Sequence, residues 1–216
     1  SSARHELYAL SLLASPYYDF RGVGVEVSSN TNVFTSDGVK LSMIQKPSFT
    51  PPHPTTGSNL GGSPVVFHGS LLRGACHPIV DYNGSSVNAT YQFVDQDTLL
   101  TVTPAQPQVG TIPVRITLNG QQYDDAHVFG FFDEPYIQLF SPTSGPIEGG
   151  TRIVLDGGLF TGGSAPFCRF GSALVDAHVG DDHARKLLCR LPGSLAPGIY
   201  PLEATLNGQV SMLDGD

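Results

Sequence analysis

The feature that most constrains this chain is an internal repeat with a period of 88 residues. The stretch "PTTGSNLGGSPVVFHG" begins at Pro54, and the similar stretch "PTSGPIEGGTRIVLDG" begins at Pro142, 88 residues later. The same offset relates "GTIPVRITLNGQ", which begins at Gly110, to "GIYPLEATLNGQ", which begins at Gly198. Several segments that share one offset indicate a true repeat, and a fixed period is typical of proteins built from tandem structural modules.

The same frame extends toward the N-terminus and divides the chain into blocks. Gly22, which lies 88 residues before Gly110, opens the alternating segment "GVGVEV". We therefore expect the C-terminal part of one repeat in residues 1–46, a complete repeat in residues 47–134, and in residues 135–216 a third repeat that lacks its last strand.

Within each block the local pattern indicates β-structure. "TRIVLDG" and "IPVRITLNG" alternate apolar and polar residues and are rich in β-branched side chains. The pairs Asn119-Gly120 and Asn207-Gly208 are strong hairpin-turn signals. The 25 Gly, the 17 Pro and a charged fraction of only 14% are typical of short strands joined by many turns. The sequence predicts an all-β chain of tandem two-sheet antiparallel sandwiches.

The composition argues against two classes of partner. The chain has 11 Lys and Arg against 19 Asp and Glu, a formal net charge of −8. A protein that binds nucleic acid through phosphates needs a basic surface, so nucleic acid is not an expected partner. No segment approaches the roughly 20 apolar residues of a membrane-spanning helix, so no membrane span is expected in this segment.

No pattern of catalytic, cofactor-binding or metal-binding residues emerges from the sequence. The seven His are scattered and fall in no G-x-S-x-G or H-E-x-x-H motif. The pairs Gly61-Gly62 and Gly149-Gly150 lack the Lys-Ser/Thr that follows a phosphate-binding glycine loop, and we interpret them as tight turns into strands. Acidic pairs such as Asp133-Glu134 lack the spacing of a calcium loop, and we interpret them as solvated turn residues.

Residues 135–212 carry a resemblance to a known family. "PYIQLFSPTSGPIEGGTRIVLDGGLF", followed by "FCRFG", "LLCRLPG" and "GIYPLEATLNGQ", resembles the IPT/TIG domain, which has an immunoglobulin-like fold. Residues 47–134 resemble it more weakly but in the same frame, with Ser58 in place of the Pro that follows the first Gly. The resemblance implies tandem immunoglobulin-like β-sandwiches of a kind that occurs in extracellular receptors and surface proteins.

The three cysteines have different expected roles. Cys168 and Cys189 occupy the two positions at which the resemblance implies a disulfide, and closing such a loop would stabilise the fold by about 3 kcal/mol. Thr101 stands 88 residues before Cys189, so the middle repeat lacks this second partner. Cys76 is then left over, either as a buried free thiol or as one half of an intermolecular bridge.

Two glycosylation sequons lie close together in the middle repeat. "NGS" begins at Asn83 and "NAT" at Asn88, and we expect both in one polar loop. Together with the implied disulfide they favour an extracellular or cell-surface glycoprotein with attached glycans.

The expected function is that of a non-enzymatic structural or adhesive repeat module of a longer cell-surface or filament-forming glycoprotein. Its partners would be proteins, among them copies of itself in a fibril or surface array. If the chain ends where a repeat is incomplete, an open sheet edge could receive a strand from a neighbouring protomer, and residues 22–46 could supply one. The alternatives are an accessory domain of a secreted carbohydrate-active enzyme and a cytoplasmic or axonemal scaffold, and the acidic charge argues against a DNA-binding domain.

Overall fold

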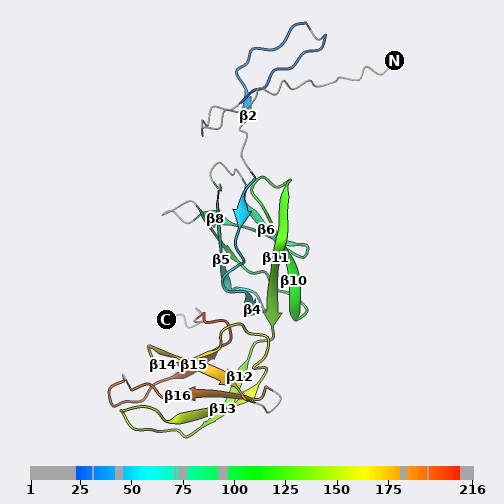
Figure 1. Ribbon diagram of the computed structural model, residues 1–216. Coiled ribbons are helices and arrows are strands. Elements are labelled where there is room, and N and C mark those ends of the chain that lie inside the picture. The colour runs from blue at the N-terminus through cyan, green and yellow to red at the C-terminus, as the bar shows by residue number, and fades with distance from the viewer. Residues whose placement is uncertain are drawn as a thin grey trace. The chain divides into compact units, whose positions relative to one another are not determined.

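The computed structural model describes residues 23–30, 32–41, 46–70, 72, 77–91, 97–180, 184–193 and 195–209. It divides into two compact units, residues 1–47 and residues 48–216. The described residues form strands, turns and loops and contain no helix (Figure 1). The expected all-β fold class is confirmed.

The first unit contains one short antiparallel pair among its described residues. Strands β1 (Val23–Gly24) and β2 (Lys40–Leu41) pair with Val23 opposite Leu41. Eighty-eight residues later in the sequence, β10 (Gly110–Thr117) and β11 (Tyr123–Phe132) of the middle repeat also form an antiparallel pair. That residues 1–46 are the end of a further repeat stays a prediction.

The middle repeat is a sandwich of two sheets. One sheet has the order β4-β11-β10-β6-β7 and the other the order β3-β5-β9-β8. All neighbouring strands are antiparallel except β4 and β11. The strands are β3 (Ser48–Phe49), β4 (Thr56–Ser58), β5 (Pro64–Ser70), β6 (Ile79–Tyr82), β7 (Ser85–Asn88), β8 (Thr90–Tyr91), β9 (Thr98–Val102), β10 (Gly110–Thr117) and β11 (Tyr123–Phe132).

The third repeat has the strand order β12-β13-β16-β15-β14-β17. Its strands are β12 (Tyr136–Ser141), β13 (Arg152–Gly158), β14 (Phe167–Phe170), β15 (Ala173–Val179), β16 (Lys186–Arg190) and β17 (Leu202–Thr205). Strand β15 pairs with β14 through its first half and with β16 through its second half. It therefore belongs to both layers, whereas the middle repeat divides the equivalent residues between β7 and β8.

The 88-residue offset predicted from the sequence holds at the level of strand register. In the middle repeat Pro64 pairs with Val102, and in the third repeat Arg152 pairs with Arg190, each partner displaced by 88. The pairings of β6 with β10 and of β14 with β17 show the same displacement. The two repeats therefore share one fold, and a position in one can be compared directly with its counterpart in the other.

Each repeat encloses its own apolar core. Val65, Phe67 and Phe129 are fully buried in the middle repeat, and Leu155 and Leu187 are fully buried in the third, with their sequence neighbours exposed or half-buried. This is the alternation expected for strands with one face on a core.

The two Gly-Gly pairs are turns, as the sequence predicts. Gly61 and Gly149 have φ values of 79° and 76°, which favour glycine. A Cβ on Gly61 would lie 2.6 Å from the backbone nitrogen of Ala105, and one on Gly149 would lie 2.5 Å from that of Gly193. Both turns therefore need glycine for backbone conformation and for close packing.

Candidate interaction surfaces

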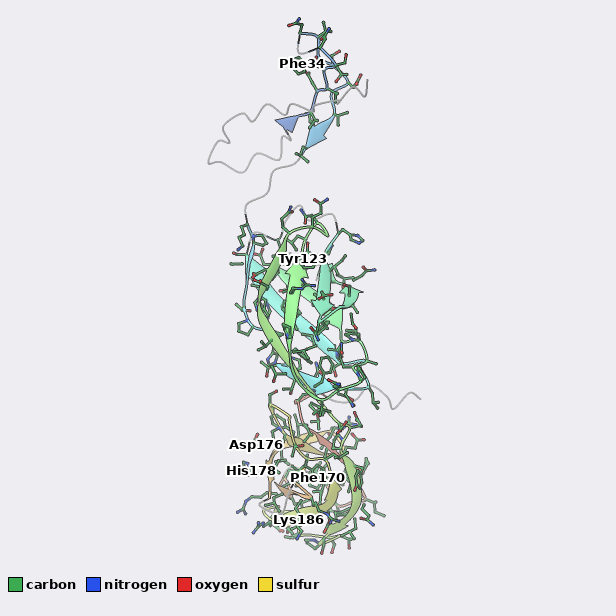
Figure 2. All side chains as sticks on the ribbon, turned by 90° about the vertical axis from the view of Figure 1, so that its right-hand side faces the viewer. Phe34, Tyr123, Phe170, Asp176, His178 and Lys186 are labelled. Atoms are coloured by element: carbon green, nitrogen blue, oxygen red, sulfur yellow. A yellow bond between two sulfur atoms is a disulfide. The ribbon has the colours of Figure 1, made fainter. Side chains whose placement is uncertain are left out.

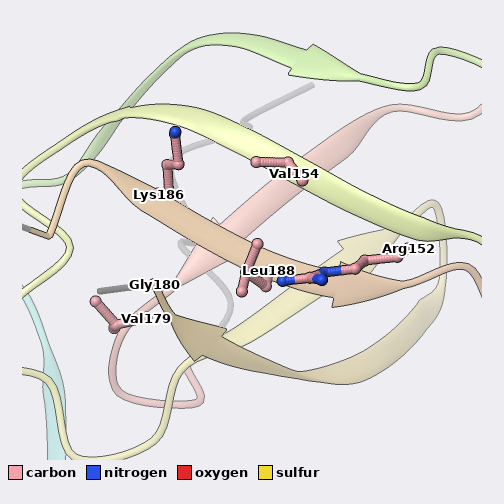
Figure 3. A pocket seen from close by; sticks show the side chains of 6 residues that line it. All are labelled: Arg152, Val154, Val179, Gly180, Lys186 and Leu188. Atoms are coloured by element: carbon pink, nitrogen blue, oxygen red, sulfur yellow. The ribbon is translucent and has the colours of Figure 1, made fainter. Parts of the chain in front are cut away.

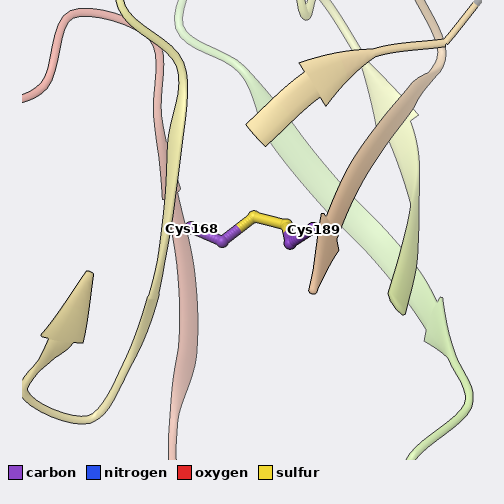
Figure 4. Close-up of a disulfide and its surroundings, with 2 residues drawn as sticks. All are labelled: Cys168 and Cys189. Atoms are coloured by element: carbon purple, nitrogen blue, oxygen red, sulfur yellow. A yellow bond between two sulfur atoms is a disulfide. The ribbon is translucent and has the colours of Figure 1, made fainter. Parts of the chain in front are cut away.

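A disulfide joins the two layers of the third repeat. Cys168 lies on β14 and Cys189 on β16, both side chains are buried, and their sulfur atoms are bonded (Figure 4). Their Cα atoms are 6.3 Å apart, within the range that a disulfide spans. The bridge ties together strands that share no backbone ladder, so it fixes the packing of the layers.

The middle repeat has no such bridge at the equivalent place. Val80 and Thr101 stand 88 residues before the two cysteines, and both are buried. The Thr101 hydroxyl has no hydrogen-bond partner among the described residues. The leftover Cys76 lies outside the described residues, so its role as a free or intermolecular thiol stays a prediction.

The two sequon asparagines lie on one β-hairpin rather than in one loop. Asn83 is in the turn between β6 and β7, with φ of 50°, and Asn88 is the last residue of β7. Both are exposed. The expectation of a single polar loop missed β7 because "SSVN" lacks the apolar alternation of a core strand. Both side chains remain accessible positions for a glycan, and their occupancy stays a prediction.

A buried carboxylate stabilises this hairpin. Asp81 is 4% exposed and accepts hydrogen bonds from the Gly84 backbone amide, the Ser86 hydroxyl and the Arg115 guanidinium. Burial alone would raise the pKa of Asp81, but these donors together hold it below its usual value. Asp81 therefore stays charged at neutral pH and holds the turn that presents Asn83.

An aromatic side chain at the end of β11 joins the middle repeat to the third. Phe132 is 6% exposed and belongs to the core cluster of the third repeat, whereas its neighbours Phe129 and Phe131 belong to that of the middle repeat. A Cβ on Gly162 would lie 3.0 Å from the Cβ of Phe132. The end of one sandwich is thus packed into the core of the next.

Hydrogen bonds surround this aromatic contact. The Ser164 backbone amide donates to the Thr56 hydroxyl over 3.0 Å, and the Thr56 hydroxyl donates to that of Ser164. The Asn207 side-chain amide donates to the Thr56 carbonyl over 3.2 Å, and that of Gln209 donates to the Pro64 carbonyl. The contact thus uses β4 and the start of β5 in the middle repeat, and the loops before β14 and after β17 in the third.

Asp133, in the linker after β11, accepts a hydrogen bond from the Asn59 side chain over 2.8 Å. No group of three or more His, Cys, Asp or Glu side chains suited to a metal ion occurs among the described residues. Nor does any described segment form a helix long and apolar enough to cross a membrane. The sequence identified Asp133 as a turn residue but gave no indication of its partner.

The outer face of the third repeat carries a basic concavity. It has a volume of about 420 Å³ and lies over β13, β15 and β16 (Figure 3). Arg152 stands directly opposite Arg190, and Val154 opposite Leu188. Lys186 and the exposed His178 also lie on this repeat (Figure 2). The lining residues are Arg152, Val154, Val179, Gly180, Lys186 and Leu188.

This face distinguishes the two repeats chemically. The central pair Val154–Leu188 corresponds to Val66–Leu100, but Pro64 and Val102 stand where the third repeat has its two arginines. Like charges opposite each other on a sheet are unfavourable, and Arg190 donates a hydrogen bond to the Gly150 carbonyl. The concavity has Arg152 and Lys186 beside an apolar centre, and Asp156 stands opposite Lys186.

The buried histidine of the middle repeat is not arranged for catalysis. His127 is 6% exposed, packs edge-on against Phe49 and Phe67, and its Nε2 lies 3.8 Å from Asp124 Oδ2. Burial raises the pKa of Tyr82, another core residue of this repeat, whose hydroxyl has no partner among the described residues. Side chains so enclosed are core residues without access to a substrate.

Several solved structures are similar to this chain. The extracellular region of plexin A4 matches 85% of this chain at 16% identity with a TM-score of 0.50, and this chain spans 17% of the plexin chain. The Escherichia coli adhesin FdeC matches 76% of this chain and 60% of its own at 13% identity, with a TM-score of 0.32. The Bacteroides uniformis protein SGBP-B, from a xyloglucan utilization locus, matches 76% of this chain and 46% of its own at 17% identity, with a TM-score of 0.28. The likeness to plexin A4 shows the fold alone.

Sequence comparison assigns the family directly. No curated protein sequence matches the chain. The sequence profile of the IPT/TIG domain matches it twice, over residues 47–129 and 135–215. These two matches cover the middle and third repeats, which the structure folds as sandwiches in a common register. The chain therefore belongs to the IPT/TIG domain family and carries two such domains in tandem.

Proposed function

We propose that this chain is a non-enzymatic extracellular structural module whose tandem repeats are held in fixed contact. The observation that carries the proposal is the junction. Phe132 is the last residue of β11 in the middle repeat, and its side chain is buried in the core of the third repeat. Hydrogen bonds to Thr56 on β4 and to Pro64 at the start of β5 support it. A junction with a shared core residue transmits force and orientation between repeats, as a structural module requires.

The family and the chemistry of the described side chains support a non-enzymatic role. IPT/TIG domains are typically non-catalytic modules. A hydrolase would need a nucleophile and a base within hydrogen-bond reach of each other and of a substrate. His127 and Tyr82 are enclosed in the core, and the open concavity on the third repeat presents guanidinium, ammonium and aliphatic groups. That surface suits contact with a protein partner.

An extracellular location is supported by three features. Disulfides persist in oxidising compartments, and Cys168–Cys189 joins two strands of a core. Both sequon asparagines are exposed. The plexin A4 chain that the fold resembles is described as a full extracellular region.

Intact-mass measurement after secretion from a eukaryotic host tests the location. We expect enzymatic removal of N-linked glycans to lower the mass, and Asn83→Gln with Asn88→Gln to abolish that change. We also expect alkylation after reduction, but not before it, to label Cys168 and Cys189. A secreted chain without glycans, whose two cysteines are labelled before reduction, would contradict an extracellular role.

The junction itself is tested by a single isosteric change, Asn207→Asp. It replaces the donor to the Thr56 carbonyl and to Gln209 Oε1 with a carboxylate oxygen, while the Oδ1 that accepts from the Gln209 backbone amide is kept. Because the Ser164 amide donates across the junction, its hydrogen exchange reports junction opening. We expect this exchange to become at least roughly 10-fold faster, because a hydrogen bond across the junction is lost and a carboxylate then faces the Thr56 carbonyl.

Asn119→Asp is the matched control, since it makes the same change 88 residues earlier, where no hydrogen bond to Thr56 exists. It should leave the exchange of the Ser164 amide unchanged. Fast exchange of that amide already in the wild-type chain would mean that the junction does not form, and the structural proposal would fail.

Strand exchange between protomers is the finer form of this proposal. Strand β10 pairs with both β6 and β11, whereas its counterpart β17 pairs, among the described residues, only with β14. A strand from a neighbouring copy would pair with the second edge of β17, as β11 pairs with β10 in the middle repeat. Such an exchange would slow the hydrogen exchange of β17 amides as protein concentration rises.

A further inference from the structure

Both repeats carry an ion pair at the same place, with the two charges exchanged. In the middle repeat Asp81 on β6 lies directly opposite Arg115 on β10, and Arg115 Nη2 donates to Asp81 Oδ1 over 3.0 Å. In the third repeat Arg169 on β14 lies directly opposite Glu203 on β17, and Arg169 Nε donates to Glu203 Oε2 over 2.6 Å. Arg169 stands 88 residues after Asp81, and Glu203 stands 88 residues after Arg115. Both repeats therefore have an attractive pair here, but the acid and the base stand on opposite strands.

Two of the strands that carry these pairs have nearly the same sequence. "PVRITLNGQ", which begins at Pro113 and includes the end of β10, and "PLEATLNGQ", which begins at Pro201 and includes β17, differ only by Val to Leu, Arg to Glu and Ile to Ala. Chains with several repeats characteristically misfold by wrong pairing between them. In an exchanged pairing, as we call it here, β17 would pair with β6 or β10 would pair with β14.

The apolar side chains do not prevent an exchanged pairing. With the native register, β17 on β6 would set Leu202 opposite Tyr82. It would also set Ala204 opposite Val80. All four side chains pack in or against a core in the native repeats. The disulfide does not prevent the exchange either, because it joins β14 to β16 and involves neither β10 nor β17.

The charges do oppose an exchanged pairing. With the native register, β17 on β6 would set Glu203 opposite Asp81, and β10 on β14 would set Arg115 opposite Arg169. Like charges directly opposite each other on a sheet are destabilising, whereas opposite charges stabilise it. Asp81 is 4% exposed and would also lose the guanidinium that offsets the cost of burying its charge. Each exchanged pairing thus replaces an attraction with a repulsion.

We propose that the reversed ion pair selects the strand partners when the two repeats of one chain fold, directing β10 to β6 and β17 to β14. Stability alone would be served equally well by the same direction in both repeats. A complete exchange loses two attractive pairs and gains two repulsive pairs, each a change of roughly 3-fold in the pairing equilibrium. Together they favour the native pairing on the order of 100-fold. This selection acts during folding and does not depend on the proposed structural role of the folded chain.

Giving the third repeat the ion pair of the middle repeat tests the proposal. The reversed variant, Arg169→Asp with Glu203→Arg, keeps an attractive pair but gives both repeats the same direction, so an exchanged pairing is no longer repulsive. Arg169→Lys with Glu203→Asp is the matched control, because it changes the same two side chains and keeps the native direction. Each full chain, with its disulfide intact, is unfolded in urea and refolded by dilution at roughly 1 μM, where association between chains is limited.

Interrupted refolding measures the mispaired fraction. After a set refolding time the protein is returned to high urea, and the fraction that unfolds at a rate different from that of the native chain is counted as mispaired. We expect this fraction to be at least roughly 10-fold larger in the reversed variant than in the wild type, and unchanged in the control. The urea midpoint of the native protein should be the same in all three, because each retains an attractive pair. The assay thereby separates mispairing from a loss of stability.

The wild type provides a second measurement that needs no variant. At about 1 M salt the Debye length is about 3 Å, so the selection weakens while the strands are still exposed to solvent. The mispaired fraction of the wild type should then rise, and that of the reversed variant should change little. A wild type without this rise would overturn the proposal, as would equal mispaired fractions in the wild type and the reversed variant at low salt. A mispaired fraction that disappears on dilution would also contradict it, because the exchange would then occur between chains.

Discussion

Replacing Cys168 with Val and Cys189 with Thr is expected to destabilise the third repeat by about 3 kcal/mol. These residues are the ones that the middle repeat carries at the same two positions, Val80 and Thr101, so the fold accommodates their shapes. What is lost is the covalent link across 21 residues that restricts the unfolded chain. The loss is a large part of the stability of one small sandwich.

Urea titration combined with hydrogen exchange separates the effect by repeat. The slowest amides of β16 should exchange on the order of 100-fold faster in the double variant, as a loss of about 3 kcal/mol predicts. The exchange rates of the β9 amides, their counterparts in the middle repeat, should not change. If β16 and β9 respond alike, or neither responds, the bridge does not stabilise the third repeat in this way.

Replacing Phe132 with Ala is expected to cost about 3 kcal/mol and to uncouple the two repeats. The side chain is 6% exposed and is packed with Leu155, Phe160 and Leu206 in the core cluster of the third repeat. Removing the ring leaves a cavity at the place where the two sandwiches meet. Thermal unfolding followed by circular dichroism should show a lower midpoint for the third repeat.

Phe131→Ala is the matched control for this change. It removes the same ring one residue earlier, but Phe131 belongs to the core of the middle repeat. It should lower the stability of the middle repeat and leave the hydrogen-exchange rate of the Ser164 amide close to its wild-type value. A Phe132→Ala chain in which the Ser164 amide remains as protected as in the wild type would show that the aromatic contact does not hold the junction.

Much of the fold was predictable because the same strand patterns occur in the middle repeat and again in the third repeat. The 88-residue frame aligns the sequence of β5 with that of β13 and the sequence of β9 with that of β16. The strand registers follow that frame. The Gly-Gly turns were predictable because each Gly pair precedes an apolar strand. One continuous β15 in place of β7 and β8 was not predictable, since Ala89 and Ala177 are the same residue in the two repeats.

The junction was not predictable from the same pattern. Phe129 and Phe131 follow the alternation of a core strand, and Phe132 falls on the opposite side, where an apolar residue carries no periodic signal. Its partner Gly162 lies in a loop. The one available signal was the identity of "TLNGQ" in both repeats, which exceeds what a hairpin turn alone requires. The arginine pair on the outer face needed the strand register to bring Arg152 opposite Arg190.

The central claim is that the middle and third repeats move as one structural unit, and their rotational diffusion tests it most directly. Nitrogen-15 relaxation of the full wild-type chain should give residues 48–134 and residues 135–209 the same rotational correlation time, and Phe132→Ala should separate the two values. Two distinct, shorter correlation times in the wild type would contradict the account, because the repeats would then tumble independently and the buried Phe132 junction would not exist in solution.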